Sequence, residues 1–253
     1  MTRQAVIPAA GEGTRLRPLT RDRPKGLLEV AGEPILSRCF DGLLSAGIEE
    51  AVVVVGYRAA DVVSQYGDAY RGLELQYVHQ RNRLGLGHAV SLAEPFVTEE
   101  SLLVNGDNVF APEFDFGTLL DRHRRGSAAV TALAERLPPE EASETGVFEP
   151  ANPRQTGDDG GRVTVAGVVE KPDDPPSGLA SAGCYVLPPD VFAACDLLRP
   201  GDRGEYELST AVDVLCTAGA RVEAIDVASL DGWRVNVNRR ADLERASERI
   251  RDR

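Results

Sequence analysis

A glycine-containing segment near the start of the sequence has the residue types that could bind phosphate groups. It follows an apolar run at residues 4–8 and reads Ala9-Ala10-Gly11-Glu12-Gly13-Thr14-Arg15. Residues without a bulky Cβ allow backbone N–H groups to turn toward a phosphate. Arg15 could direct two donors at phosphate oxygens, and Lys25 could add a compact positive charge. The segment therefore predicts a phosphate site, although two glycines alone are also typical of an ordinary turn.

Two familiar phosphate-binding motifs do not fit this segment. A dinucleotide-binding motif would have a third glycine, and a P-loop would contain Gly-Lys-Ser or Gly-Lys-Thr. The sequence has neither feature here. A dinucleotide-dependent oxidoreductase is therefore disfavoured and is kept only as a distant alternative.

The scarcity of lysine draws attention to the two lysines that are present. Lys25 and Lys171 stand in a chain with 26 arginines, and each lies beside a proline, in Pro24-Lys25 and in Glu170-Lys171-Pro172. Because proline disfavours the helical conformation of the residue before it, Lys171 is expected to have an extended backbone. An ordinary Glu-Lys pair would simply be solvated, but the scarcity of lysine favours a functional role.

Asp107 is a candidate metal ligand. It follows the apolar run at residues 102–104, where an α/β sheet places its ligands at the carboxyl ends of the strands. A carboxylate there could hold Mg²⁺ against a phosphate, since this ion prefers oxygen ligands. Taken alone, residues 105–108 would be interpreted as a polar turn.

The elements that must position these residues alternate between strand and helix over the first 130 residues. The apolar positions predict strands at residues 4–8, 51–55, 73–78 and 101–104, and helices at residues 35–46, 59–66, 86–95 and 116–125. Such alternation is typical of βαβ units, whose parallel strands form a sheet with helices on both faces.

The pattern becomes less regular in the second half. Further strands are predicted at residues 127–134, 163–169, 180–187 and 221–227, and helices at 209–218 and 241–251, with loops rich in proline, glycine and aspartate at 138–143, 150–161 and 171–178. Insertions of this kind usually build the substrate side of a cleft. We therefore predict an α/β fold with a Rossmann-like, mostly parallel central sheet and an inserted β subregion. We expect a single domain of residues 1–253, with halves at about 1–130 and 131–230 and a C-terminal helix at 239–253.

The charge balance excludes several classes of partner. The chain has 40 acidic and 28 basic residues, a net charge of −12, and an acidic surface repels nucleic acid and anionic membranes. Residues 1–30 are the exception, because six basic minus three acidic residues give +3. We find no signal peptide and no long apolar run, and we expect a cytoplasmic, halophile-like acidic protein. High-GC coding or a high-salt cytoplasm could each produce the strong preference for arginine over lysine. The four cysteines and three histidines lack the spacing of a metal site.

The segment from Gly11 to Thr20, followed by Pro24-Lys25, resembles the signature of the sugar-phosphate nucleotidyltransferases, also called NDP-sugar pyrophosphorylases. The resemblance continues in order through Val55-Gly56-Tyr57, Gln80, Gly85-Leu86-Gly87-His88-Ala89, Gly106-Asp107-Asn108, Gly146-Val147, Glu170-Lys171-Pro172, Gly183-Cys184-Tyr185 and Gly204-Glu205-Tyr206-Glu207-Leu208-Ser209. It covers nearly the entire chain. Within the family, the chain is most similar to the short archaeal glucose-1-phosphate uridylyltransferases and thymidylyltransferases.

The resemblance assigns nucleotide binding to the first half of the chain. It implies that the nucleotide meets Ala9, Ala10, Gly11, Gly13, Thr14, Arg15, Gln80, Gly85 and Asp107. Arg15, Lys25 and Asp107 would be the catalytic residues. The Gln80 amide has both a donor and an acceptor, as the imide edge of a pyrimidine requires, and Gly85 would let the ring lie close to the backbone.

The resemblance assigns the sugar phosphate to the second half. Lys171 would meet the phosphate, Glu170 the sugar hydroxyls, and Gly146 the other side of the sugar. The family's second metal ligand is an acidic residue near the end, which Asn236 matches here, with Asn238 as another candidate. An amide oxygen can bind Mg²⁺ but adds no charge, so we expect Asp107 and Asn236 to bind the metal more weakly than two carboxylates would.

The implied reaction joins a nucleoside triphosphate to a sugar 1-phosphate and releases pyrophosphate. UTP and glucose 1-phosphate are the favoured substrates, with dTTP as the alternative nucleotide. A different class also stays open: a catalytically weak, sugar-nucleotide-binding regulatory subunit, for which Asn236 is the supporting feature. The sequence does not distinguish a monomer from a homo-oligomer, nor does it identify the sugar epimer or the downstream glycan.

Overall fold

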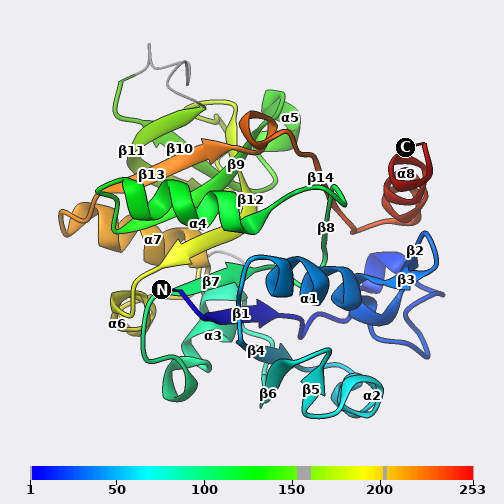
Figure 1. The fold of residues 1–253 in the computed structure, drawn as a ribbon. Helices are drawn as coiled ribbons and strands as arrows, with labels where there is room; N and C mark the ends of the chain where they lie inside the picture. The colour runs from blue at the N-terminus through cyan, green and yellow to red at the C-terminus, as the bar shows by residue number, and fades with distance from the viewer. Residues whose placement is uncertain (1, 153–160, 202–203, 253) are drawn as a thin grey trace.

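The computed structural model describes residues 2–152, 161–201 and 204–252 (Figure 1). The strands are β1 (Gln4–Pro8), β2 (Glu29–Val30), β3 (Glu33–Pro34), β4 (Glu50–Val55), β5 (Ala69–Tyr70), β6 (Leu73–His79), β7 (Ser101–Val104), β8 (Asn108–Phe110), β9 (Val130–Arg136), β10 (Gly146–Pro150), β11 (Arg162–Glu170), β12 (Leu179–Leu187), β13 (Val222–Asp226) and β14 (Arg234–Asn236). The helices are α1 (Ile35–Ser45), α2 (Ala59–Tyr66), α3 (Leu86–Ser91), α4 (Phe116–Arg125), α5 (Pro139–Ala142), α6 (Asp190–Asp196), α7 (Leu208–Thr217) and α8 (Arg240–Arg251).

Ten strands form one central sheet in the order β10-β11-β13-β9-β12-β7-β1-β4-β6-β5. Parallel pairing joins β7, β1, β4 and β6, where the βαβ alternation predicts it, and it also joins β9 to β13. Strand β12 lies between β7 and β9 and is antiparallel to both. The sheet is therefore mixed: most of its antiparallel pairs involve strands of the inserted second half, and β5 adds one more by pairing antiparallel with β6 at the opposite edge.

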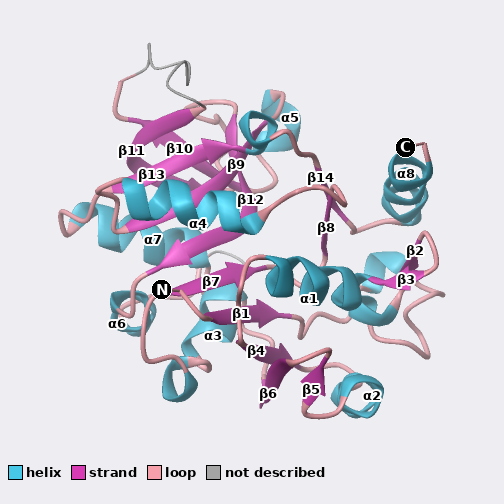
Figure 2. Ribbon diagram, viewed as in Figure 1, coloured by secondary structure: helices cyan, strands magenta, loops and turns pink. Residues whose placement is uncertain are grey.

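Alternating side chains of each central strand enter two cores on opposite faces of the sheet. In β4, Val52 and Val54 enter one core, whereas Ala51, Val53 and Val55 enter the other. Residues of α3, α6 and α7 complete the first core, and residues of α1, α2 and α4 complete the second (Figure 2). The predicted α/β class with helices on both faces is confirmed.

A third core attaches the C-terminal helix away from the sheet. Leu243 and Ala246 of α8 pack with Val30 of β2, Val109 of β8 and Val235 of β14. Helix α8 therefore lies beside β2 and β3, at the end of the molecule to which β1 and β7 point (Figure 1). This packing brings residues 236–238 next to the turn that follows β7.

Most predicted elements are present, with some differences. Helices at 59–66 and 116–125 and the strand at 101–104 have the predicted bounds. Helix α3 ends at Ser91 instead of residue 95, because Pro95 has no N–H to donate to the Ser91 carbonyl and lies instead in a separate 3₁₀ turn at Glu94–Phe96. Strands β2, β3, β5, β8, β10 and β14 and helices α5 and α6 were not predicted, and α5 lies within the loop predicted at residues 138–143. Most of the predicted loop at 150–161 lies outside the described residues.

In the described part of the chain, no helix combines the length and the apolar character needed to cross a membrane.

Candidate active site

A cleft of about 580 Å³ opens at the carboxyl ends of the parallel strands β1, β6 and β7. Every residue predicted to meet the nucleotide lines it, and so does Lys25: the set is Ala9, Ala10, Gly11, Gly13, Thr14, Arg15, Lys25, Gln80, Gly85 and Asp107. These residues are far apart in sequence and converge because parallel strands all end at the same edge of the sheet.

The segment after β1 turns sharply at Gly13, which has a φ of 61°. A side chain at this position would be strained and would also crowd the Cγ2 of Thr20, which lies 3.0 Å from an ideal Cβ. Thr20 fixes the turn by donating its hydroxyl to the Gly13 carbonyl at 2.8 Å. The short 3₁₀ turn Thr14–Leu16 follows and leaves Arg15 exposed at the cleft. The exposed guanidinium can therefore reach a bound phosphate.

Gln80 is buried at the end of β6 and its amide nitrogen already has two partners. The Nε2 donates to the Gly85 carbonyl at 3.0 Å and lies 2.9 Å from Nδ1 of His88. The sequence predicts that the Gln80 amide offers both a donor and an acceptor to the base. In the structure its nitrogen is already hydrogen-bonded within the protein, so the carbonyl oxygen is the group left to contact the base. The sequence predicts no separate role for His88, because the spacing of the three histidines bears only on metal binding.

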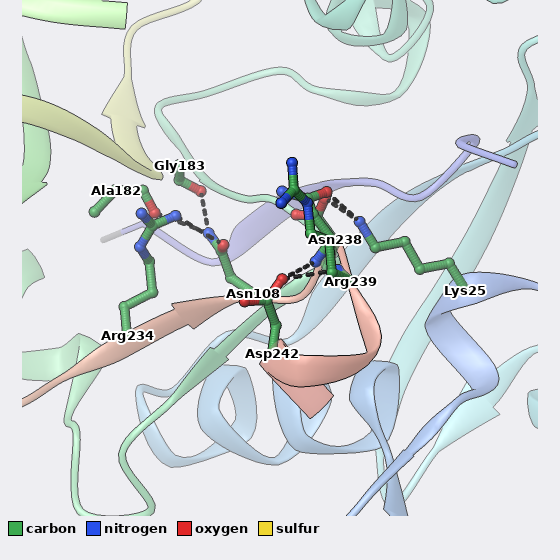
Figure 3. A network of polar contacts seen from close by, with 9 residues as sticks. Lys25, Asn108, Ala182, Gly183, Arg234, Asn238, Arg239 and Asp242 are labelled. Atoms are coloured by element: carbon green, nitrogen blue, oxygen red, sulfur yellow. Dashed lines mark hydrogen bonds and ion pairs between the residues drawn. The ribbon is translucent and has the colours of Figure 1, made fainter. Parts of the chain in front are cut away.

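Asp107 lies in the turn between β7 and β8 and faces Lys25. The Nζ of Lys25 is 2.8 Å from Oδ2 of Asp107. It is also 2.9 Å from Oδ1 of Asn238 (Figure 3). Asn238 in turn is held by α8, because its backbone N–H donates to Asp242 at 2.9 Å. Of the two asparagines considered from the sequence, Asn238 lines the cleft. Asn236 instead pairs with Asn108 in the β14–β8 ladder.

Three side-chain oxygen atoms in the turn after β7 and in β14 have the chemistry that suits a metal ion. The Oδ1 atoms of Asn105, Asp107 and Asn236 are all buried and have no hydrogen-bond partner among the described residues. Carboxylate and amide oxygens are ligands that Mg²⁺ accepts, usually with phosphates and waters completing the shell. Within the described residues, no group of three or more His, Cys, Asp or Glu side chains could hold a metal alone. The donor set therefore fits a Mg²⁺ ion that is bound jointly with a nucleotide.

Arg234 is buried behind this turn. Its Nη1 donates to Oδ1 of Asn108 at 3.1 Å (Figure 3). Its Nη2 forms an ion pair with Glu135. Burial lowers the pKa of Arg234 to about 10, although the charge of Asp107 opposes that shift. Asn108 also donates to the carbonyl of Ala182 at 2.8 Å. These bonds fasten the Asp107 turn to β12 and β14.

The residues predicted to meet the sugar phosphate form a second cluster, outside the lining of this cleft. The Nζ of Lys171 lies 2.7 Å from Oε1 of Glu170 and 2.8 Å from Oε1 of Glu207. The Ser209 hydroxyl donates to the other oxygen of Glu170 at 2.6 Å. An ideal Cβ on Gly146 would lie 3.1 Å from the Ser209 Cβ. The structure thus brings Gly146, Glu170 and Lys171 together.

The prediction that Pro172 holds Lys171 in an extended conformation is wrong. Lys171 has a φ of 43°, in the left-handed region. Its backbone N–H donates to the carbonyl of Thr145 at 3.0 Å, and its ammonium is held by two carboxylates. Burial lowers the pKa of Lys171, but the hydrogen bonds to Glu170 and Glu207 outweigh it and leave the pKa above its ordinary value. These tertiary contacts override the local preference of a residue before proline.

Further residues line the cleft that the sequence does not identify as site residues, among them the polar residues Arg83, Asn105 and Glu205. Arg83 forms an ion pair with Glu12 at 2.6 Å, which joins the loop after β6 to the loop after β1. Glu205 lies within a quoted motif, which was a usable signal. No sequence motif marks Arg83 or Asn105 as a binding residue, so only their position in the structure identifies them.

Comparison with known proteins agrees with this geometry. Residues 4–234 match the family described as nucleotidyl transferase. The chain is 42% identical to the UTP–glucose-1-phosphate uridylyltransferase AglF of Haloferax volcanii, over 98% of this chain and 97% of that protein. It is 34% identical to a glucose-1-phosphate thymidylyltransferase of Streptomyces antibioticus, over 88% of this chain and 60% of that protein.

Solved structures show the same fold. A crystal structure of UDP-glucose pyrophosphorylase complexed with UDP-glucose superposes with a TM-score of 0.86 at 24% sequence identity, over 98% of each chain. Together with the match over residues 4–234, the 42% identity to AglF confirms the resemblance noted in the sequence. The chain belongs to the nucleotidyl transferase family.

Proposed function

We propose that the protein transfers a nucleotidyl group from UTP to glucose 1-phosphate, which forms UDP-glucose and releases pyrophosphate. The observation that carries this proposal is the convergence of Arg15, Lys25 and Asp107 in one cleft at the ends of β1 and β7. The 42% identity to AglF, which extends over 97% of that protein, supports UTP as the nucleotide. We assign nucleotide binding to residues 1–130 and sugar phosphate binding to residues 131–230.

In this proposal, a phosphate oxygen of glucose 1-phosphate attacks the α-phosphorus of UTP in line. The new P–O bond forms as the bond to the β-phosphate breaks, and pyrophosphate leaves. The nucleophile is already anionic, so the protein needs no general base and no covalent intermediate. Its task is to align two anions that repel each other and to offset the charge of the transition state.

Each cationic side chain has a place in this task. Arg15 is exposed at the cleft and would contact the β- and γ-phosphates that become pyrophosphate. Lys25 would contact phosphate from its position between Asp107 and Asn238. Lys171 would hold the phosphate of the sugar. Glu170 would bind sugar hydroxyls, with Gly146 against the opposite side of the sugar.

A metal ion belongs to this proposal. The family generally uses a divalent metal, and we propose Mg²⁺. The free Oδ1 of Asp107 and the amide oxygen of Asn236 would hold it. When bound, the ion would offset the charge on the α-phosphate.

Two alternatives remain, and one experiment separates them. The thymidylyltransferase of Streptomyces antibioticus favours dTTP as a second candidate nucleotide, and Asn236 in place of an acid favours a binding subunit with little activity. Pyrophosphate release is measured for five nucleoside triphosphates against several sugar 1-phosphates, with Mg²⁺. We expect the highest kcat/KM with UTP and glucose 1-phosphate. A preference for dTTP would make the protein a thymidylyltransferase, and no release with any pair would contradict the proposed activity.

We also propose a cytoplasmic location. The structure leaves Cys39, Cys184, Cys195 and Cys216 as free thiols, the state that a reducing compartment maintains.

A further inference from the structure

Residues 205–209 connect the nucleotide cleft to the Lys171 cluster and have no role in the function proposed so far. We refer to them as the connecting segment. It precedes and enters helix α7, which begins at Leu208. Glu205 lines the cleft at one end, and Ser209 contacts Glu170 at the other. A segment in this position can set one binding region relative to the other.

One side of the connecting segment pairs with the loop that holds Gln80 and Gly85. The backbone N–H of Tyr206 donates to the Leu84 carbonyl, and the N–H of Gly87 donates to the Tyr206 carbonyl, both at 2.7 Å. The approach is so close that an ideal Cβ on Gly85 would lie 2.6 Å from the Tyr206 oxygen. This pairing fixes the segment against the loop that would meet the base.

The other side of the connecting segment holds Lys171. Glu207 places Oε1 at 2.8 Å from the Lys171 ammonium, and both side chains are partly buried, with 17% and 24% of their side-chain surface exposed. Glu170 holds the same ammonium at 2.7 Å. An ammonium has three N–H donors, so two carboxylates leave one donor for a phosphate oxygen.

Lys171 needs these contacts because its backbone is in an unfavourable conformation. A φ of 43° is uncommon for any residue except glycine, and Pro172 makes the position still more restricted. Such a conformation persists only when the surrounding structure determines it. Of the residues that contact Lys171, Glu207 belongs to the connecting segment and so links Lys171 to the nucleotide cleft.

We propose that Glu207 is a positioning residue, which fixes the Lys171 ammonium for the phosphate of the sugar substrate. This inference rests on the proposed function, because Lys171 is assigned there to the sugar 1-phosphate. Glu207 does not contact substrate in this account and acts only through Lys171.

A double-mutant cycle tests the proposal. Glu207→Leu and Lys171→Ala are made singly and together, and KM is measured for glucose 1-phosphate and for UTP. Loss of one charge-assisted hydrogen bond should raise KM for glucose 1-phosphate about tenfold in Glu207→Leu, with KM for UTP unchanged. In the Lys171→Ala background the same substitution should have no further effect. Glu207→Gln, whose amide oxygen can still accept from Lys171, should retain most of the wild-type KM.

Controls separate positioning from a general loss of structure. Glu140→Leu makes the same change at an exposed position of α5 and should leave both KM values unchanged. Thermal unfolding of each variant is measured alongside. An equal rise in KM for UTP, an unchanged KM for glucose 1-phosphate, or an undiminished effect of Glu207→Leu without Lys171 would each overturn the proposal. Absence of turnover in the wild-type protein would instead overturn the proposed function, and this inference with it.

Discussion

The ammonium of Lys25 lies 2.8 Å from the carboxylate of Asp107, although the two residues are 82 positions apart in sequence. The same ammonium reaches Asn238, which precedes the C-terminal helix. One side chain thus joins the loop after β1, the turn after β7 and the segment after β14. The contact keeps a positive charge beside the carboxylate at the point where we place the reacting phosphates.

Removing the charged groups that face the phosphates should slow the reaction strongly. Arg15→Ala and Asp107→Ala should each lower kcat by at least about 100-fold, because each group stabilises charge that develops as pyrophosphate departs. Initial rates of pyrophosphate release at saturating substrates and Mg²⁺ measure the effect. Arg21→Ala, which removes a guanidinium outside the cleft lining, is the matched control. Wild-type turnover in either site variant would refute the assignment of that residue.

The two halves of the site should respond to different substrates. Lys171→Ala should raise KM for sugar 1-phosphate far more than KM for the nucleotide, because its ammonium is assigned to the sugar phosphate. Gln80→Ala should mainly reduce discrimination between pyrimidine and purine triphosphates, because Gln80 is buried beside Gly85 in the loop assigned to the base. Steady-state kinetics with UTP, dTTP, ATP and GTP provide the comparison. If both substitutions affected both substrates equally, the division into two halves would be wrong.

Asn236 and Asn238 should differ in their effect on the metal. Asn236→Asp should lower the Mg²⁺ concentration for half-maximal rate, since a carboxylate adds Coulomb attraction beside Asp107. The rate itself need not rise, because the added charge also repels the phosphates. Asn238→Asp should act mainly through Lys25, because the side-chain oxygen of Asn238 already accepts a hydrogen bond from the Lys25 ammonium. Mg²⁺ titrations of the two variants give the Mg²⁺ concentration for half-maximal rate. If this concentration changed only in Asn238→Asp, Asn238 would be the ligand. If it changed in neither variant, this segment would not be part of the metal site.

Several features of the site lie beyond what the sequence predicts. The βαβ alternation predicted the parallel strands β1, β4, β6 and β7, and therefore the edge where the phosphate segment and Asp107 meet. It did not predict that β12 inserts between β7 and β9, because the direction of a strand depends on partners that are distant in the chain. The preference of a residue before proline predicted an extended backbone for Lys171, which is wrong. Contacts with Glu170, Glu207 and Thr145 together determine the backbone conformation of Lys171.

Asn238 illustrates the same limit within the active site. From the sequence, Asn238 is only the second candidate for the metal ligand after Asn236, because the two residues are of the same type and lie two positions apart. Their separation comes from the β14–β8 ladder, which pairs Asn236 with Asn108, and from the cap of α8, which holds Asn238 through Asp242. Neither contact has a signal in the local pattern.

The stability of the fold should decrease at acid pH through a hydrogen-bonded pair outside the cleft lining, which joins the buried His123 to the partly exposed Glu100. Nε2 of His123 donates to the carboxylate of Glu100 at 2.7 Å, and its Nδ1 lies 2.7 Å from the Thr131 hydroxyl. The hydrogen bond from His123 is the main cause of a lowered pKa for Glu100. A carboxylate with a lowered pKa stabilises the fold fully above its ordinary pKa of 4.5. That contribution is lost as the pH falls through the pKa of the folded state.

Denaturant unfolding at several pH values measures this contribution. The difference in free energy of unfolding between wild type and Glu100→Gln should be constant near neutral pH and should shrink below pH 4.5. Glu140→Gln, at an exposed position, serves as the control. A difference that stays the same down to pH 3 would show that the Glu100 pKa is not lowered by folding.

The transfer of the α-phosphate is the central claim and can be followed directly. The protein is incubated with Mg²⁺, glucose 1-phosphate and UTP labelled with ³²P at the α-phosphate, and the products are separated. Attack at the α-phosphorus predicts that the label appears in UDP-glucose, that none appears in pyrophosphate, and that unlabelled pyrophosphate forms in equal amount. Label that remains in UTP, or that appears in UMP or UDP without a nucleotide sugar, would contradict the assignment of this protein as a sugar-1-phosphate nucleotidyltransferase.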